Sequence, residues 1–400
     1  MQKRYSIMNS DTKLFLQNKF REYYKNARVD LPPNFNKREW AFVLFDDAYP
    51  RLIMRRHKAF SSFVDIGTYL ETLTPAHVYH STAYYKYPSA TKMISKEWEA
   101  ADLIFDLDAD QIIKGDVSSY SHMLSAVKEE TKKLLTFLTE DFALNEDHIR
   151  VVFSGGRGYH VHVREERLTK LGSHERREVI NYVSGNGLEA EYIIYPKKIS
   201  EYSESPTRWE TRIAKWIERY FKSLLEMQER DAIEQLTSFK DVGRKKATEI
   251  FENLEEIVGN LDGGSDAPRL IISRLTTESF WKGVVRRAIL ELKVNVDEPV
   301  TADTKRLIRL PSSLHGGSGF CVAPIDWEQF DDFDPLYDAI VFSDEMTPVR
   351  VLSKTTTDIK NERIIADEKT VELPEHTAIY LMARGYAEYE PRRSKSHKKQ

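Results

Sequence analysis

The stretch 101–110, ADLIFDLDAD, constrains the fold most, because an apolar run with the length of a buried strand ends in acidic residues at alternate positions. If 103–108 form a β-strand, Asp106 and Asp108 share one face and the apolar residues between them point into the opposite layer. Two carboxylates on one face can bridge two divalent cations ~3.5 to 4 Å apart. A strand that runs into an acidic turn is the alternative interpretation.

Composition sets broad limits on the class of protein. The chain has 400 residues, 41% of them hydrophobic, which is enough for a sizeable core in one large domain or two domains. The net charge of −4 gives no global sign of nucleic-acid binding, so any such surface must be a local basic patch. Cys321 is the single cysteine, which excludes an internal disulfide and a zinc site built from two cysteines.

The sequence predicts a soluble, cytoplasmic protein. Its first residues contain charges but no apolar stretch of signal-peptide length. No apolar run approaches the ~20 residues that a membrane-spanning helix needs. A single cysteine also fits a reducing compartment.

A glycine-rich turn, SGGRG at 154–158, is the second informative feature. Predicted strands flank it, so backbone N–H groups can gather around a phosphate while Arg157 adds a fixed charge. The turn lacks the spacing of a P-loop and is not followed by a helix. His160 and His162 alternate onto one face of the next strand, where contact with phosphate or carboxylate is favoured over metal ligation.

The third feature is the segment 294–320, VNVDEPVTADTKRLIRLPSSLHGGSGF. Its first residues predict the end of a strand that brings Asp297 to the first pair of carboxylates. Donors suited to polyphosphate oxygens follow, namely Arg306, Arg309, Ser313 and His315. Three carboxylates beside a basic, glycine-lined pocket are typical of metal-assisted transfer to or from a triphosphate.

Hydrophobic periodicity predicts an α/β (α+β) fold in which mixed β-sheets are flanked by helices. Residues 1–163 and 276–390 are expected to form a discontinuous core, with a helical subdomain inserted at 164–275 and a disordered basic tail at 391–400. Within the insertion, 239–254 resemble a helix-hairpin-helix that presents backbone N–H groups to DNA phosphates. A plain helix–turn–helix connection with solvated lysines is the alternative.

Local patterns also predict individual elements. Helices are expected at 11–26, 62–73 and 118–142, and strands at 77–85 and 148–153, with two strands joined by a turn at 46–50 within 38–60.

The motifs FDLDAD, SGGRGYHVHV and VDEPVTADTKRLIRLPSSLHGGSGF, in this order, resemble the catalytic (small) subunit of archaeal-eukaryotic DNA primase, the archaeal form in particular. The resemblance covers roughly residues 12 to 385. It implies a primase-type core and a nucleotidyltransferase that uses two Mg²⁺ or Mn²⁺ ions. Such an enzyme makes short RNA primers from nucleoside triphosphates on single-stranded DNA during replication, and it needs no existing 3′ end.

The same resemblance implies roles for individual residues. Asp106, Asp108 and Asp297 match the metal-binding and catalytic aspartates. The nucleotide-binding positions are Ser154, Arg157, His160, Arg309, Ser313 and His315, with Arg56 as a looser match in R-x-x-[SA]-F. Tyr79 and Ser81 are placed near the ribose.

The chain departs from the family pattern at two places. Residues 111–128 hold no cysteine and only His122, so no structural zinc is predicted. Gly317 stands where some archaeal relatives have a lysine, so one phosphate contact is expected to be absent or supplied by Arg306. The resemblance also implies partners: a large primase subunit with an iron–sulfur cluster, the single-stranded DNA template, NTPs or dNTPs, and the replication machinery, with no membrane contact.

Three other functions stay open on the sequence alone. One is a repair or translesion polymerase of the same superfamily, which extends existing primers. Another is a non-catalytic nucleotide-binding regulator, although three clustered acids are of little use to a protein that binds an anion. The last is a structural nucleic-acid module that uses the hairpin at 239–254.

Overall fold

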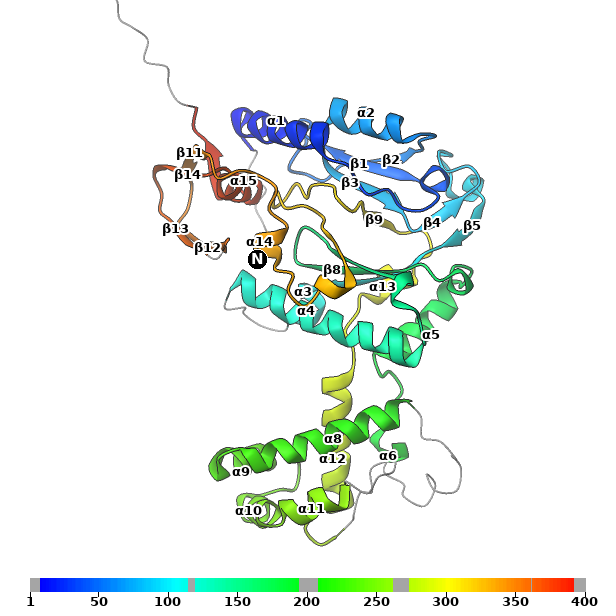
Figure 1. The fold of residues 1–400 in the computed structure, drawn as a ribbon, viewed down its shortest axis with the longest axis vertical. Coiled ribbons are helices and arrows are strands. Elements are labelled where there is room, and N and C mark those ends of the chain that lie inside the picture. Colours follow the sequence, from blue (N-terminus) through cyan, green and yellow to red (C-terminus); the bar gives the residue numbers. More distant parts are fainter. Residues whose placement is uncertain (1–7, 114–118, 194–207, 262–272, 361, 392–400) are drawn as a thin grey trace, which may run out of the picture. The chain divides into compact units, whose positions relative to one another are not determined.

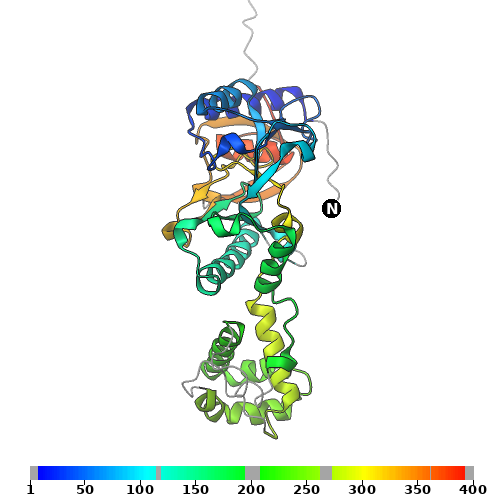
Figure 2. The same cartoon turned by 90° about the vertical axis from the view of Figure 1, so that its right-hand side faces the viewer.

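The computed structural model describes residues 8–113, 119–193, 208–261, 273–360 and 362–391 (Figures 1 and 2). It combines helices with antiparallel sheets, as the predicted fold class requires. The chain divides into two compact units, of which the first comprises Met1–Ile180 and Asn295–Gln400 and the second Asn181–Val294.

The first unit contains a four-stranded antiparallel sheet of order β2-β1-β3-β9. Its strands are β1 (Trp40–Leu44), β2 (Met54–Lys58), β3 (Pro75–Ser81) and β9 (Leu307–Arg309). Two helices, α1 (Ser10–Asn26) and α2 (Phe63–Leu73), cover this sheet (Figure 1). Every residue of the inner strand β3 is buried: β1 and β9 pair with its two edges, and α1 contacts it.

The second sheet of this unit has the order β10-β7-β8-β6 and carries the sequence motifs. Its strands are β6 (Leu103–Asp108), β7 (Ile149–Phe153), β8 (Gly158–Val163) and β10 (Pro324–Ile325). Helix α4 (Tyr120–Thr136) packs on β6 and β8. The apolar side chains of both strands are buried, while the alternate positions of β6, Asp106 and Asp108, are partly exposed.

The C-terminal segment forms smaller sheets beside this core. Strands β11 (Met346–Val351), β14 (Thr370–Pro374) and β15 (Ala387–Tyr389) pair in the order β14-β11-β15 next to helix α15 (Glu375–Arg384). A separate two-stranded pair of this segment is β12 (Thr355–Ile359) with β13 (Glu362–Ala366). Another pair, β4 (Ala83–Tyr85) with β5 (Trp98–Ala101), comes from the N-terminal part of the chain. The last strand returns to the first helix, where the rings of Tyr389 and Phe15 stack 4.3 Å apart.

The second unit is helical. Its helices are α6 (Ala190–Ile193), α8 (Arg208–Glu226), α9 (Glu229–Thr237), α10 (Arg244–Glu252), α11 (Leu254–Leu261) and α12 (Glu278–Leu292). Helix α8 buries one apolar stripe with i, i+3 and i+4 spacing, and its Phe221 packs against Trp281 of α12 at 5.5 Å between ring centroids. The predicted hairpin at 239–254 contains the turn between α9 and α10, with Gly243 at the N-cap of α10.

The extent of this unit differs from the predicted insertion at 164–275. Helix α5 (Ser173–Val183) starts in the first unit, because the buried guanidinium of Arg176 donates to the carbonyls of Ala101 and Asp102 at 2.9 Å. Helix α12 joins the second unit by packing on α8. The proposed subdomain limits therefore stay a prediction.

Most predicted elements are confirmed, with two exceptions. The single strand expected at 77–85 is two strands, β3 and β4, which belong to different sheets. The expected strand end at 294–297 is wrong, since these residues belong to no strand of any sheet. Asp297 instead caps the short helix α13 (Glu298–Ala302), in which Pro299 occupies the first turn. A proline there suits a helix start and removes a ladder donor. Of the predicted tail, residues 392–400 lie outside the described chain.

A buried ion pair connects the two main sheets. The guanidinium of Arg38 donates to the Asp102 carboxylate at 2.7 Å, and both side chains are 0% exposed. Asp102→Ala is expected to cost about 3 to 5 kcal/mol, because it leaves a buried cation unpaired. Equilibrium urea unfolding measures this loss.

The matched control is Glu99→Ala, which breaks the exposed Lys37–Glu99 pair of similar length, 2.9 Å. Its expected cost is below about 1 kcal/mol. Equal losses for the two variants would contradict the structural role assigned to the Arg38–Asp102 pair.

Candidate active site

Three aspartates from two distant parts of the sequence meet at the end of β6. Asp106 and Asp108 lie opposite His160 and Gly158 of β8 in the antiparallel register. The backbone N–H of Asp297 donates to the carbonyl of Asp106 at 3.0 Å, which fixes the third acid beside the pair. The sequence predicted that Asp297 lies near Asp106 and Asp108. Asp297 reaches them as the N-cap residue of a helix and not from the end of a strand.

The acids influence one another electrostatically. Burial raises the pKa of Asp106, the charges of Asp108 and Asp297 add to this rise, and Arg309 and Arg306 oppose it, so that the pKa is about 7. At weakly acidic pH the folded protein therefore keeps a proton on Asp106 that an exposed aspartate has lost.

The donor chemistry of this cluster suits hard divalent cations. Among the described residues, no three or more His, Cys, Asp or Glu side chains converge into a ready metal-binding group. The aspartates nevertheless offer only oxygen donors, and an added cation would relieve the repulsion that raises the pKa of Asp106. The residues present fit Mg²⁺ or Mn²⁺ better than a soft metal.

The glycine turn packs closely against neighbouring segments. Gly155 has φ +74°, and a Cβ at this position would lie 2.6 Å from Cβ of His315. A Cβ at Gly158 would lie 1.9 Å from the carbonyl oxygen of Leu107. Both positions therefore require glycine, and the turn lies between β6 and the His315 segment. Ser154 is buried, and its Oγ faces the N–H of Gly156 at 3.4 Å.

Arg157 points from this turn toward the acids. Its guanidinium donates to both carboxylate oxygens of Asp110 at 2.7 and 2.5 Å and lies 3.3 Å from Asp108 Oδ1. Asp110 belongs to the short helix α3 (Ala109–Ile112), which begins where β6 ends. The sequence patterns did not predict this pairing of Asp110 with Arg157.

His160 is a buried, neutral residue next to the acids. Its Nε2 lies 3.7 Å from Asp106 Oδ1. Burial lowers the pKa of His160 to about 3, and the charges of Arg309 and Arg306 contribute. The ring of His162 is 6.2 Å away on the same face, where burial also holds its pKa well below the usual value. The histidine pair has no described third ligand, so metal binding there gains no support.

The predicted phosphate-binding residues of the third motif, Arg309, Ser313 and His315, lie in different surroundings. Arg309 lies on β9 opposite Tyr79, with its guanidinium 5.7 Å from the centre of that ring. The ring of His315 meets His77 edge-on at 4.8 Å. Ser313 is fully buried and donates to the carbonyl of Leu310 at 2.7 Å, so its hydroxyl is engaged with the backbone.

Arg56 lies apart from the other predicted nucleotide-binding residues. It sits on β2, at the edge of the first sheet opposite to β9. Its guanidinium pairs with the buried carboxylate of Glu39 at 3.0 Å. Ser81, predicted near the ribose, donates to the carbonyl of Ala83 at 2.7 Å. No contact recorded for the described residues joins Arg56 to the aspartates, and its role stays a prediction.

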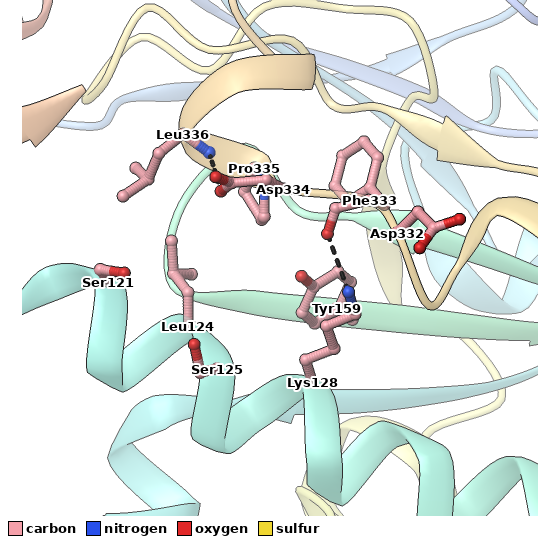
Figure 3. Close-up of a pocket in the computed structure, with 10 residues that line it drawn as sticks. All are labelled: Ser121, Leu124, Ser125, Lys128, Tyr159, Asp332, Phe333, Asp334, Pro335 and Leu336. Carbon is pink, nitrogen blue, oxygen red and sulfur yellow. Dashed lines mark hydrogen bonds between the residues drawn. The ribbon is translucent and has the colours of Figure 1, made fainter. Parts of the chain in front are cut away.

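A pocket of about 200 Å³ lies between β8, α4 and the segment 332–336 (Figure 3). It is lined by Tyr159 of β8, by α4 residues such as Leu124 and Lys128, and by the segment 332–336. Tyr159 and His160 are consecutive residues of one strand, so they point to opposite faces. This pocket is therefore separate from the acidic cluster.

Paired aspartates on an antiparallel sheet, a third aspartate beside them and a cationic glycine turn are typical of metal-dependent nucleotidyltransferases. Comparison with known proteins identifies the family. The family model described as DNA primase small subunit matches residues 105–327. The DNA primase small subunit PriS of Methanococcoides burtonii is 44% identical over 403 residues, which cover 96% of this chain and 100% of the relative.

The corresponding protein of Methanosarcina barkeri is 40% identical over 411 residues, covering 97% of this chain and 99% of the relative. The chain belongs to the DNA primase small subunit family. A solved polymerase domain of Mycobacterium tuberculosis ligase D in complex with DNA covers 84% of this chain and 90% of its own, at 14% identity and a TM-score of 0.35. That likeness is too low to carry an argument.

Family membership confirms the predicted function. The chain is a primase-type nucleotidyltransferase that synthesises RNA primers for DNA replication. Enzymes of this kind generally use divalent metal ions, and a small subunit implies a larger partner subunit and a DNA substrate. None of the described helices is long and apolar enough to cross a membrane.

The raised pKa of Asp106 predicts a pH-dependent stability in metal-free buffer. Between about pH 4 and pH 7 the folded protein keeps a proton that the unfolded chain has released, so stability falls as the pH rises through this range. Asp106→Asn removes the charge. The variant is expected to be more stable than the parent at pH 8 by on the order of 2 kcal/mol, and about equally stable at pH 4.

Thermal unfolding in EDTA at both pH values measures this effect. Asp47→Asn serves as control, because Asp47 is fully exposed. A pH profile of Asp106→Asn that runs parallel to the parent would show that Asp106 is not the group responsible.

Proposed function

We propose that Asp106, Asp108 and Asp297 hold two divalent cations, Mg²⁺ or Mn²⁺, and so form the catalytic centre for template-directed primer synthesis. The observation that carries this proposal is the meeting of the three aspartates at the end of β6, where the N–H of Asp297 donates to the carbonyl of Asp106 at 3.0 Å. The charges of Asp108 and Asp297 act on Asp106 and help to raise its pKa. Ions held by these carboxylates would supply activation of the 3′-hydroxyl of the first nucleotide and neutralisation of the charge on the pyrophosphate leaving group.

The side chains around the acids would orient the triphosphate for in-line attack. Arg157, Arg309 and His315 supply donors from three separate segments, and the glycine turn supplies backbone N–H groups. Arg157 is exposed and bound to Asp110, so it can exchange that carboxylate for a phosphate at little cost. Ser154, Ser313 and Arg56 remain proposed contacts of the same nucleotide.

His160 plays a different part in this scheme. As a buried, neutral imidazole it can donate one hydrogen bond without adding charge to the site. Its Nε2 faces Asp106, so the ring would hold that carboxylate, or a phosphate oxygen bound next to it, in a fixed position.

The template would be bound mainly through backbone charge and base stacking. Such binding depends on salt and tolerates any sequence, as a primase that starts at many sites requires. The proposed substrates are NTPs, with dNTPs as the competing choice. A large subunit that carries an iron–sulfur cluster and the replication machinery are the proposed protein partners.

Replacing Asp108 tests the catalytic centre. Asp108→Ala is expected to abolish primer synthesis, because losing a metal ligand costs several kcal/mol of transition-state stabilisation, at least about 100-fold in rate. The measurement is de novo synthesis on circular single-stranded DNA, together with the melting temperature. Asp108→Asn should be equally inactive while keeping an acceptor for the Asp110 N–H, which Asp108 accepts at 3.1 Å.

Asp47→Ala, at a fully exposed acid, should leave synthesis unchanged. Near-normal synthesis by both Asp108 variants would refute the assignment. If the parent protein extends existing primers but starts none on circular DNA, a repair or translesion polymerase becomes the better description.

His315 provides a separate test of the triphosphate site. His315→Ala is expected to raise the nucleotide KM about 10-fold and to leave template affinity unchanged, because a charge-assisted contact to phosphate is lost. Steady-state kinetics and fluorescence anisotropy with labelled single-stranded DNA measure the two quantities. His315→Gln, which keeps a donor, should lie between parent and alanine variant. An unchanged KM would remove His315 from the site.

A further inference from the structure

We infer that Tyr120 and Ser318 are positioning residues, whose hydroxyl groups turn two carbonyls of the glycine turn inward and thereby aim its N–H groups at the nucleotide phosphates. The inference rests on the proposed role of this turn in triphosphate binding. Neither residue was among the nucleotide-binding positions predicted from the sequence. Each reaches the turn from a different part of the chain.

Tyr120 holds the second glycine carbonyl. It is the first residue of α4, and its hydroxyl donates to the carbonyl of Gly156. The guanidinium of Arg384, the last residue of α15, lies 4.7 Å from the centre of the Tyr120 ring and 4.9 Å from that of Tyr380. The ring therefore has a fixed place between the turn and the C-terminal helix, and its hydroxyl has one direction.

Ser318 holds the first glycine carbonyl. Its hydroxyl donates to the carbonyl of Gly155 at 2.5 Å, and the side chain is buried. A hydroxyl has one proton to donate, so toward its other neighbours it is an acceptor. It accepts from the N–H of Phe320 at 3.2 Å and lies 3.0 Å from Nδ1 of His315. Ser318 thus fixes the turn and the ring of His315 together.

These two bonds determine where the N–H groups point. In a trans peptide the N–H and C=O groups are antiparallel. Carbonyls of Gly155 and Gly156 that point inward to Ser318 and Tyr120 therefore direct the N–H groups of Gly156 and Arg157 the other way. The positive φ of Gly155, +74°, allows successive N–H groups to converge as in an anion-binding nest.

Another proposed phosphate ligand, His315, lies beside the turn. A Cβ at Gly156 would lie 3.4 Å from Nε2 of His315, so this nitrogen faces the turn. The N–H of Gly156 has a long contact with Ser154 Oγ, 3.4 Å, which a phosphate oxygen can replace.

A purely structural interpretation is that the two hydroxyls only satisfy two inward-facing carbonyls, as buried polar groups generally require. Both interpretations predict some loss of stability when a hydroxyl is removed. They differ in the nucleotide KM, which changes only if the turn's N–H groups contact the triphosphate.

Tyr120→Phe removes one oxygen and keeps the ring beside Arg384. The expected result is a nucleotide KM raised about 3- to 10-fold, the value of one net hydrogen bond, with kcat changed less than about twofold. Affinity for single-stranded DNA should not change. Ser318→Ala should likewise raise the nucleotide KM and leave kcat nearly unchanged. A folding defect in one variant therefore leaves the other as a test.

Tyr23→Phe is the matched control, because the Tyr23 hydroxyl donates to the Ser312 carbonyl at 2.9 Å, outside the glycine turn. It should lower the melting temperature to a similar degree and leave KM unchanged. The inference is overturned if Tyr120→Phe and Ser318→Ala both lose thermal stability while KM stays at the parent value.

Variants of the proposed phosphate ligands separate this failure from failure of the proposed function. If Arg157→Ala and His315→Ala raise KM but the two hydroxyl variants do not, only the positioning role fails. If none of the four changes KM, the triphosphate does not bind at this turn and both proposals fail.

Discussion

The burial of Asp106 beside two like charges is the constraint on which the rest of the site depends. Taking a carboxylate out of water and placing it near Asp108 and Asp297 is unfavourable, as its raised pKa shows. The backbone does not allow the acids to separate, because Asp106 and Asp108 share a strand face and Asp297 is bonded to the Asp106 carbonyl at 3.0 Å. Strain of this kind is released by a proton, by nearby arginines or by a bound cation, and only the last two leave the acids charged.

Rigid elements keep this arrangement in place. The antiparallel register of β6 and β8 holds the acids opposite the glycine turn, and the Arg38–Asp102 pair anchors the start of β6 to the first sheet. That sheet also carries Arg309 at its edge, so the same contacts that stabilise the core set the distance between acids and cations. Folding and site assembly therefore share one set of interactions.

Local periodicity predicted the parts of the site that depend on neighbouring residues. Alternation along β6 placed Asp106 and Asp108 on one face, and the glycine spacing identified the turn. The strand expected before Asp297 was wrong. Asp297 caps a short helix that has proline in its first turn, and a helix cap produces no hydrophobic periodicity in the sequence. The Asp110–Arg157 pair and the hydroxyls of Tyr120 and Ser318 were missed, since their partners lie far away in the sequence.

Exposure distinguishes the arginines that maintain the fold from those suited to bind a nucleotide. Arg38 is fully buried with its carboxylate, and a buried charge that loses its partner is costly, so this residue cannot change partners. Arg157 is 44% exposed and its partner Asp110 is 64% exposed, so water can replace either side of that pair at little cost. An arriving triphosphate would therefore take Arg157 from Asp110 while the buried pair holds the strands still. Asp110 acts in this scheme as a temporary partner, which keeps the arginine near the proposed metal-binding aspartates before a nucleotide binds.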